Sequence, residues 1–203
     1  MNQIAEMTTI LIADDDPSHL MLAEAALAGA GFLVHTAADG EEAVQQFAVV
    51  KPDCVVLDVM MPKLTGIQAC RQIREQAGSQ FVPILLLTSR NDLPAISDAY
   101  AAGASDFAQK GMNPRLLVER VRFLLRDRAL QQELRSSRSK LLLAQSIARV
   151  GHWEIAIDGS TMHVSPMLGE LLGVDAGRLA RYEDLVALLD SAERDDARKA
   201  FIT

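Results

Sequence analysis

Aromatic residues are scarce in this sequence: they make up 4% of its 203 residues, whereas apolar residues make up 49%. The core must therefore be aliphatic, which suits a parallel sheet covered by helices better than a β-sandwich. Cysteine is also rare. Cys54 and Cys70 are the two present, and both lie in apolar segments, so we expect buried free thiols rather than a disulfide.

Long apolar stretches and an excess of positive charge are missing as well. No segment is long and apolar enough to span a bilayer, and the N-terminus lacks the basic and apolar regions of a signal peptide. The net charge of −7 argues against general binding to nucleic acid, which needs clustered Lys and Arg. We therefore expect a cytoplasmic protein that contacts neither membrane nor nucleic acid.

Short apolar segments alternate with helical ones through the first 126 residues. The apolar segments are 9–13, 32–36, 53–57, 84–87 and 105–109, and the helical segments are 17–30, 40–49, 66–76, 93–102 and a last one that opens at Pro114. Strands that are apolar almost throughout are typical of a parallel sheet buried on both faces. This alternation predicts an α/β protein with a doubly wound parallel sheet.

Polar side chains follow these strands where each one ends. They are Asp14, Asp15 and Asp16 after the first strand, Asp58 after the third, Thr88 after the fourth and Lys110 after the fifth. Ligands of open parallel sheets bind at this edge, and converging carboxylates repel one another unless a cation lies among them. Oxygen ligands favour Mg²⁺. Together with an ammonium and a hydroxyl, they predict a site for phosphoryl transfer. Asp16 precedes Pro17 and is expected to cap a helix.

The order and spacing of these residues resemble the response-regulator receiver family from about Thr9 to Arg126. The resemblance implies a flavodoxin-like five-stranded sheet of order 2-1-3-4-5. It also implies Mg²⁺ as cofactor, with Asp15 as a direct ligand, Asp14 as a ligand through water, and Asp58 and the Met60 backbone carbonyl completing the set. Asp58 is then the phosphoacceptor. Thr88 and Lys110 bind phosphoryl oxygens, and Thr88 and Phe107 form the conformational switch.

The sequence departs from the receiver pattern after the lysine. Such domains usually have proline there, but Gly111 follows Lys110 in this sequence. The loop therefore lacks the backbone restraint that a proline ring imposes. Met60 and Arg90, two residues after the acceptor and the hydroxyl, occupy positions that gate water in such domains. Their combination tunes the lifetime of the phosphoryl group in a direction that the sequence leaves open.

The helical pattern that opens at Pro114 continues without Gly or Pro until Gly151. Within it an a/d seam follows alternating steps of four and three: Leu130, Leu134, Ser137, Leu141, Ala144 and Ala148. We interpret the run as a parallel two-stranded coiled coil, the alternative being an amphipathic helix lying on its own domain. The predicted organisation is a receiver over residues 1–126, a helical linker over 127–148 and a last part over 149–203.

The last part resembles the start of a PAS domain. Gly151–Trp153, a strand pair joined by the turn at 158–160, and Ser165-Pro166 leading into a helix carry this resemblance, and two more helices are expected at 182–190 and 192–202. The chain stops before the later strands that such a fold needs, so we expect an incomplete α+β segment of a longer protein. The linker resembles those of regulators that make or break cyclic di-GMP, although no GGDEF or EAL motif is present.

The leading functional hypothesis is a signalling switch rather than an enzyme. A sensor histidine kinase or a phosphotransfer protein would phosphorylate Asp58, and the linker of a parallel homodimer would relay the change to an output module. Two alternatives remain. One is a receiver-like docking module that needs no phosphate. The other is a phosphohydrolase with an aspartyl nucleophile, which Met60 disfavours because such enzymes generally carry a second acid at that position.

Overall fold

In the computed structural model, a parallel sheet forms the centre of the first part of the chain. The structure describes residues 7–78, 81–89, 93–156, 161–190 and 193–194, so Arg90, the turn at 158–160 and most of the helix expected at 192–202 lie outside the described residues. The strands are β1 (Thr9–Ala13), β2 (Leu33–Ala37), β3 (Cys54–Asp58), β4 (Ile84–Thr88) and β5 (Asp106–Gln109). All four neighbouring pairs are parallel, in the order β2-β1-β3-β4-β5. The predicted flavodoxin-like sheet is confirmed.

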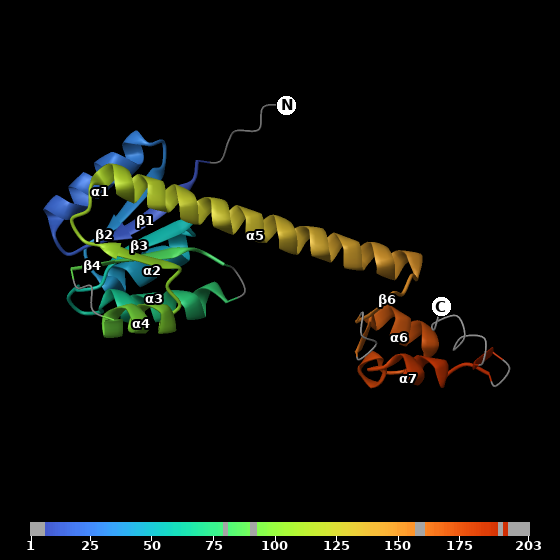
Figure 1. The fold of residues 1–203 in the computed structure, drawn as a ribbon. Helices are drawn as coiled ribbons and strands as arrows, with labels where there is room; N and C mark the ends of the chain where they lie inside the picture. Colours follow the sequence, from blue (N-terminus) through green and yellow to red (C-terminus); the bar gives the residue numbers. More distant parts are fainter. Residues whose placement is uncertain (1–6, 79–80, 90–92, 157–160, 191–192, 195–203) are drawn as a thin grey trace, which may run out of the picture. The chain divides into compact units, whose positions relative to one another are not determined.

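Helices cover both faces of this sheet (Figure 1). They are α1 (Pro17–Gly29), α2 (Gly40–Val50), α3 (Gly66–Ala77), α4 (Leu93–Ala101) and α5 (Pro114–Ala148). Side chains of α1 and α5 form an aliphatic core against one face, and those of α2, α3 and the end of α4 form a second core against the other. Strand residues alternate between the two cores. This explains why the strands are apolar at nearly every position.

The two cysteines lie in these cores, as expected. Cys54 on β3 and Cys70 on α3 are both buried and free. Burial raises the pKa of the Cys54 thiol to about 12 and that of the Cys70 thiol to about 11. Both thiols therefore remain protonated at neutral pH and act as small apolar side chains.

Three capping interactions set where the helices begin. The Asp16 carboxylate accepts a hydrogen bond from the Ser18 backbone N–H at 2.8 Å, which confirms the predicted cap of α1. Asp39 caps α2 in the same way. Thr65 and Gln68 form a capping box at the start of α3, which fixes where the loop after β3 ends.

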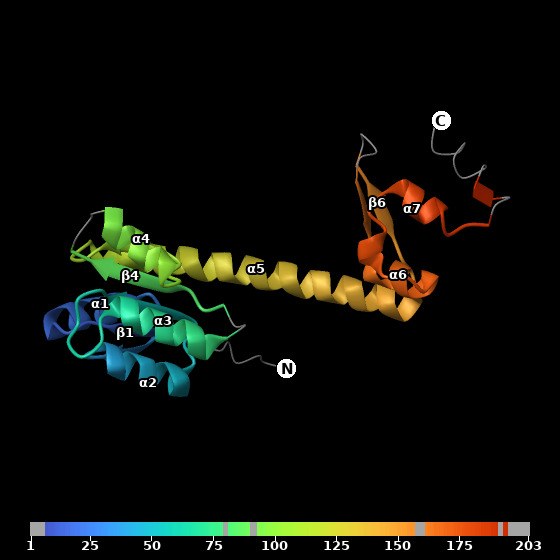
Figure 2. The same ribbon diagram turned by 90° about the horizontal axis from the view of Figure 1, so that it is seen from below.

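Helix α5 is much longer than the others, as both ribbon views show (Figures 1 and 2). It continues for 35 residues, because no glycine or proline follows Pro114 before Gly151. The chain divides into two compact units, residues 1–132 and 133–203, with the division inside this helix. The predicted boundaries at 126 and 148 stay predictions.

The second unit contains a two-stranded antiparallel sheet. β6 (Trp153–Ile155) pairs with β7 (Met162–Val164), followed by α6 (Pro166–Leu172), a 3₁₀ turn η1 (Ala176–Arg178) and α7 (Tyr182–Val186). The predicted hairpin strands and two following helices are present, although α7 ends earlier than expected and η1 was not predicted. Its small core is formed by Met162, Val164 and Leu179. Among the described helices of the chain, none combines the length and apolar character needed to cross a membrane.

Candidate functional site

The side chains that the sequence predicts at strand ends meet at the carboxyl edge of the five-stranded sheet. Asp14 and Asp15 follow β1, Asp58 ends β3, Thr88 ends β4 and Lys110 follows β5. Parallel pairing in register brings these ends to one edge. Asp14, Asp58 and Thr88 are buried and Asp15 is exposed, so the group lies at the bottom of a surface site and not inside the core.

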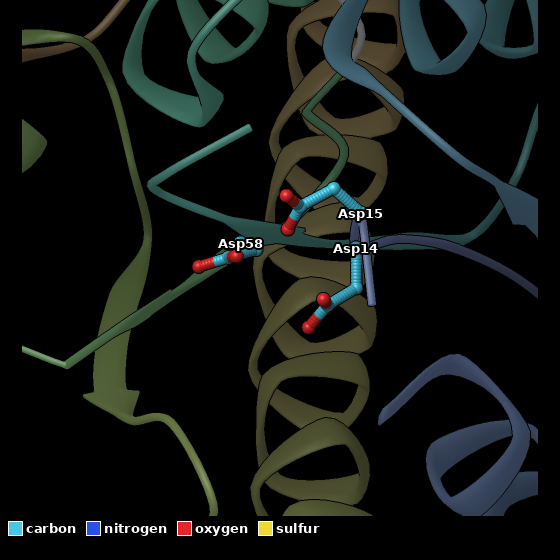
Figure 3. A group of neighbouring side chains, drawn as sticks. All are labelled: Asp14, Asp15 and Asp58. Atoms are coloured by element: carbon cyan, nitrogen blue, oxygen red, sulfur yellow. The ribbon is translucent and has the colours of Figure 1, made fainter. Parts of the chain in front are cut away.

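Three carboxylates of this group lie close enough to share a cation. Asp14, Asp15 and Asp58 each offer a carboxylate oxygen, and these oxygens all lie within 4.8 Å of one another. Figure 3 shows the three side chains arising from the ends of β1 and β3. Carboxylate oxygens without nitrogen or sulfur ligands suit a hard divalent ion such as Mg²⁺. The donor set therefore fits the ion that the sequence implies.

Lys110 supplies positive charge to two of these carboxylates. Its Nζ donates to Asp14 Oδ1 at 3.0 Å and also to Asp58 Oδ2. Burial alone lowers the pKa of the Lys110 ammonium, but the hydrogen bonds to Asp58 and Asp14 raise it overall. The ammonium therefore stays charged at neutral pH and lies beside the Asp58 carboxylate, where it is able to attract an anion.

The environment of Asp58 disfavours its ionised form, despite the hydrogen bond from Lys110. Burial raises the pKa of its carboxyl group above the usual 3.8, whereas the hydrogen bond from Lys110 and that from the Met60 backbone N–H, at 3.3 Å, lower it only in part. Desolvation disfavours the charged form of a buried carboxyl group. The metal-free protein therefore loses stability by keeping Asp58 ionised.

We predict that Asp58→Asn raises the free energy of unfolding of the metal-free protein at pH 7. The raised pKa belongs to the folded state, so the destabilisation by ionised Asp58 is full above that pKa, and it is absent below the unfolded value of 3.8. Urea denaturation in EDTA should show the gain at pH 7 and its disappearance below about pH 3.8. A gain that is equal at both pH values would show that the ionised carboxylate is not its cause.

Thr88, Phe107 and Met60, the other residues predicted to take part in the site, differ in burial and in contacts. Thr88 is buried at the end of β4, and its backbone carbonyl accepts a hydrogen bond from the Lys110 N–H at 2.8 Å. Phe107 on β5 is half-buried and packs edge-to-face on Tyr100 of α4, with ring centroids 5.8 Å apart. The Met60 side chain, two residues after Asp58, is 66% exposed. Phe107 therefore links β5, the strand that precedes Lys110, to helix α4.

Gly111 gives the loop after β5 a conformation that proline could not adopt. Its φ is +79°, in the region that favours glycine, whereas the proline ring fixes φ near −65°. A Cβ built at Gly111 would meet no atom within 4 Å. The departure from the usual receiver pattern is therefore accommodated by a different loop, which leaves open space beside Lys110.

Sequence reasoning missed two contacts of charged side chains, one in the loop after β3 and one beside the acidic group. Lys63, in the loop after β3, pairs with Asp39 at 2.6 Å, and its hydrogen bond holds the pKa of that carboxyl group below its usual value. His19, on the first turn of α1, places Nδ1 3.7 Å from Asp14 Oδ2 and 3.6 Å from Asp16 Oδ2. The spacing from Asp16 to His19, one helical turn, was the available signal for the second feature.

Known proteins resemble this chain over the part that holds the site. Residues 10–122 match the family described as the response regulator receiver domain. The chain is 33% identical over 168 residues to the alkaline phosphatase synthesis transcriptional regulatory protein PhoP of Bacillus subtilis, which covers 80% of this chain and 69% of that protein. It is 38% identical over 117 residues to the DNA-binding response regulator MtrA of Mycolicibacterium smegmatis, which covers 58% of this chain and 50% of that protein.

Solved structures match the same part. The chemotaxis protein CheY4 of Vibrio cholerae is 33% identical with a TM-score of 0.55, and the match covers 58% of this chain and 98% of that one. A putative response regulator from Chloroflexus aurantiacus is 38% identical with a TM-score of 0.56, and covers 59% and 98%. Nearly the whole of each of these two proteins matches slightly more than half of this chain, and the rest of this chain lies outside the two alignments.

Proposed function

Because this chain belongs to the response regulator receiver family, we propose that it is a phosphorelay switch whose phosphoacceptor is Asp58. The observation that carries the proposal is the convergence of Asp14, Asp15 and Asp58 within 4.8 Å, with Lys110 donating to two of them. The phosphoryl donor is a sensor histidine kinase or a phosphotransfer protein. The chain acts as a signalling protein and not as an enzyme.

Each residue of the site has a separate role in the transfer. The Asp58 carboxylate attacks the phosphorus in line with the leaving group, and Lys110 and Thr88 hold the phosphoryl oxygens. Asp14, Asp15, Asp58 and the Met60 carbonyl would hold Mg²⁺, with Asp14 acting through water. When bound, this ion neutralises charge on the transferring group. The hydrogen bond from Lys110 to Asp58 supports the role proposed for Lys110, because it brings the ammonium group to the carboxylate that attacks.

Phosphorylation adds charge, and we propose that Thr88 and Phe107 convert it into movement. Thr88 and Lys110 turn toward the new phosphoryl oxygens, and Phe107 then repacks against Tyr100 and the helices beside it. The edge-to-face contact between Phe107 and Tyr100 supports this role, since it links β5 to α4. Helix α5 then relays the change toward the second unit.

Metal removal tests the proposal directly. Acetyl phosphate with Mg²⁺ is expected to add one phosphoryl group to the wild-type chain, and EDTA is expected to abolish the addition because unshielded carboxylates repel the donor. Intact-protein mass spectrometry measures both. Labelling that persists in EDTA would contradict a metal-dependent site. No labelling of the folded protein under any condition would favour the second candidate function, a phosphate-independent docking module, which Gly111 in the loop after β5 keeps open.

We further propose that the end of α5 forms a parallel homodimer, as the a/d seam predicts. The seam residues Leu130, Leu134 and Leu141 are exposed by 66%, 72% and 59% in the single chain, which leaves apolar surface for a second copy. The chain would then consist of a receiver over residues 1–126, a linker over 127–148 and a partial PAS-like segment over 149–203. This last segment would relay the change to an output module. Cyclic di-GMP turnover by that module rests on the linker resemblance alone.

A matched pair of leucines tests this dimer. Leu141 lies on the seam, whereas Leu143 is equally exposed, at 61%, but lies off it. Leu141→Asp is expected to weaken self-association by at least about tenfold, since each copy loses a buried leucine worth roughly 1.5–3 kcal/mol. Leu143→Asp should leave it unchanged. Analytical ultracentrifugation measures both. A wild-type chain that stays monomeric, or an equal effect of the two variants, would contradict the seam.

The names of the relatives describe transcription and DNA binding by whole proteins, of which this chain spans 69% and 50%. For this chain we propose no contact with nucleic acid, because its net charge of −7 disfavours binding to phosphates. We also propose that it works in the cytoplasm and without membrane contact, where its thiols stay reduced.

A further inference from the structure

A cavity of about 280 Å³ lies beside the acidic group, between α1 and the loop after β5. Its walls are mostly apolar and include Ile12, Ala23, Leu87 and Leu117, while Asp14 and Lys110 close one end. Ile12, Leu87 and Leu117 are buried members of the core beneath α1 and α5. The cavity is therefore a surface recess whose floor is formed by residues of the core.

Lys110 lies between the cavity and the proposed phosphoacceptor and contacts both. Lys110 lines the cavity and donates from Nζ to Asp58, and Asp14, which also lines the cavity, belongs to the acidic group. A molecule that reacts at Asp58 is therefore separated from this apolar recess by the Lys110 side chain. Its volume is close to roughly 300 Å³, the lower bound of pockets that hold small organic ligands.

Gly111 and His19 are two further residues that line this recess. Gly111 lines it and has no atom within 4 Å of the position of a Cβ, so the loop here leaves room that a larger residue would fill. His19 lines it too, with its Nδ1 facing the carboxylates of Asp14 and Asp16 at 3.7 and 3.6 Å.

We propose that the cavity binds the apolar tail of small acyl phosphates, so that donors with a bulky apolar acyl group phosphorylate Asp58 faster than acetyl phosphate does. The inference rests on the proposed function and adds the class of small-molecule donor. In the transfer, an Asp58 carboxylate oxygen forms the new bond to phosphorus. The bond from phosphorus to the acyl oxygen breaks, and the acyl group leaves as a carboxylate with the electron pair. No proton and no redox partner is needed.

Acetyl phosphate and benzoyl phosphate test this cavity in the presence of Mg²⁺. The rate of labelling is measured by intact mass for the wild type and for Ala23→Leu, which fills the cavity. Ala25→Leu is the control, since Ala25 is exposed on the same helix. For each protein we compare the labelling rate with benzoyl phosphate to that with acetyl phosphate. An effect of the substitution on the transfer step itself changes both rates equally and leaves their ratio unchanged. Ala23→Leu is expected to lower this ratio by on the order of tenfold, the low end of the effect of one methylene group in an apolar pocket. Ala25→Leu should keep the wild-type ratio.

A measurement on the wild type alone guards against misfolding of the filled variant. Benzylphosphonate, which cannot transfer a phosphoryl group, should slow labelling by acetyl phosphate, whereas methylphosphonate at the same concentration should not. Equal inhibition by both phosphonates, or an unchanged ratio in folded Ala23→Leu, overturns the cavity while leaving phosphorylation of Asp58 intact. Failure of both donors to label the wild type overturns the proposed function and the cavity together.

Discussion

Asp58→Asn is expected to lose all labelling by acetyl phosphate, the largest effect of any single substitution in this protein. The amide oxygen of asparagine is a far weaker nucleophile than a carboxylate, and it also weakens the shared cation site with Asp14 and Asp15. Because the change removes a buried charge, the variant should stay folded. Intact mass after incubation with Mg²⁺ therefore measures chemistry and not loss of structure.

Asp53→Asn is the matched control for that loss. Asp53 immediately precedes β3, at the opposite end from Asp58, where it accepts from the Thr9 N–H at 2.9 Å and pairs with Arg128 at 2.8 Å. Losing a partly exposed ion pair costs about 1 kcal/mol or less. Asp53→Asn is therefore expected to label like the wild type. Labelling of Asp58→Asn at the wild-type rate would move the acceptor to another residue.

Gly66→Ala is expected to destabilise the fold and slow labelling together. A Cβ at Gly66 would lie 2.0 Å from the Asp58 backbone oxygen and 2.8 Å from its carbonyl carbon. The Gly66 N–H also donates to the Val59 oxygen at 3.0 Å, so the start of α3 is held tightly against the acceptor strand. Relieving the overlap must displace the loop after Asp58. We expect a loss of about 3 kcal/mol in the free energy of unfolding, the upper part of the range for overpacking.

Gly29→Ala is the comparison for this substitution. Gly29 ends α1, and a Cβ there would meet nothing within 4 Å. Alanine is the better helix former, so this change is expected to be neutral or to stabilise by up to about 1 kcal/mol. Chemical denaturation of both variants decides the matter. If Gly66→Ala is as stable as Gly29→Ala, the loop after Asp58 can move to accommodate a Cβ at little cost, which contradicts the prediction.

The strands and the strand-end residues were predictable because each depends on a local pattern. Segment 9–13 is apolar at four of its five positions and stops at Asp14, and the parallel order then brings Asp14 to the same edge as Asp58 and Lys110. The continuous helix α5 was predictable for the same reason, since no helix-breaking residue interrupts it. Local sequence thus determines both the elements and which of their ends carry polar groups.

Contacts between residues far apart in the chain were not predictable. The pairing of Lys63 with Asp39 spans 24 residues and leaves no spacing signal, because its geometry depends on how two loops pack. Strand order places Lys110 and Asp14 at one edge of the sheet, but the hydrogen bond between them, across 96 residues, does not follow from that order alone. The cavity beside Lys110 was hidden for a further reason. The replacement of proline by Gly111 could be seen, but the conformation with φ of +79° that leaves space there could not.

The most direct test of the central claim is to identify the atom that carries the phosphoryl group. Borohydride reduces an aspartyl phosphate to homoserine, so the wild-type protein is labelled with acetyl phosphate and Mg²⁺, reduced, digested and sequenced by mass spectrometry. We predict homoserine at position 58 and an unchanged Asp14 and Asp15. Homoserine at either of those two positions, or a phosphoryl group that resists borohydride on another residue, would contradict the account.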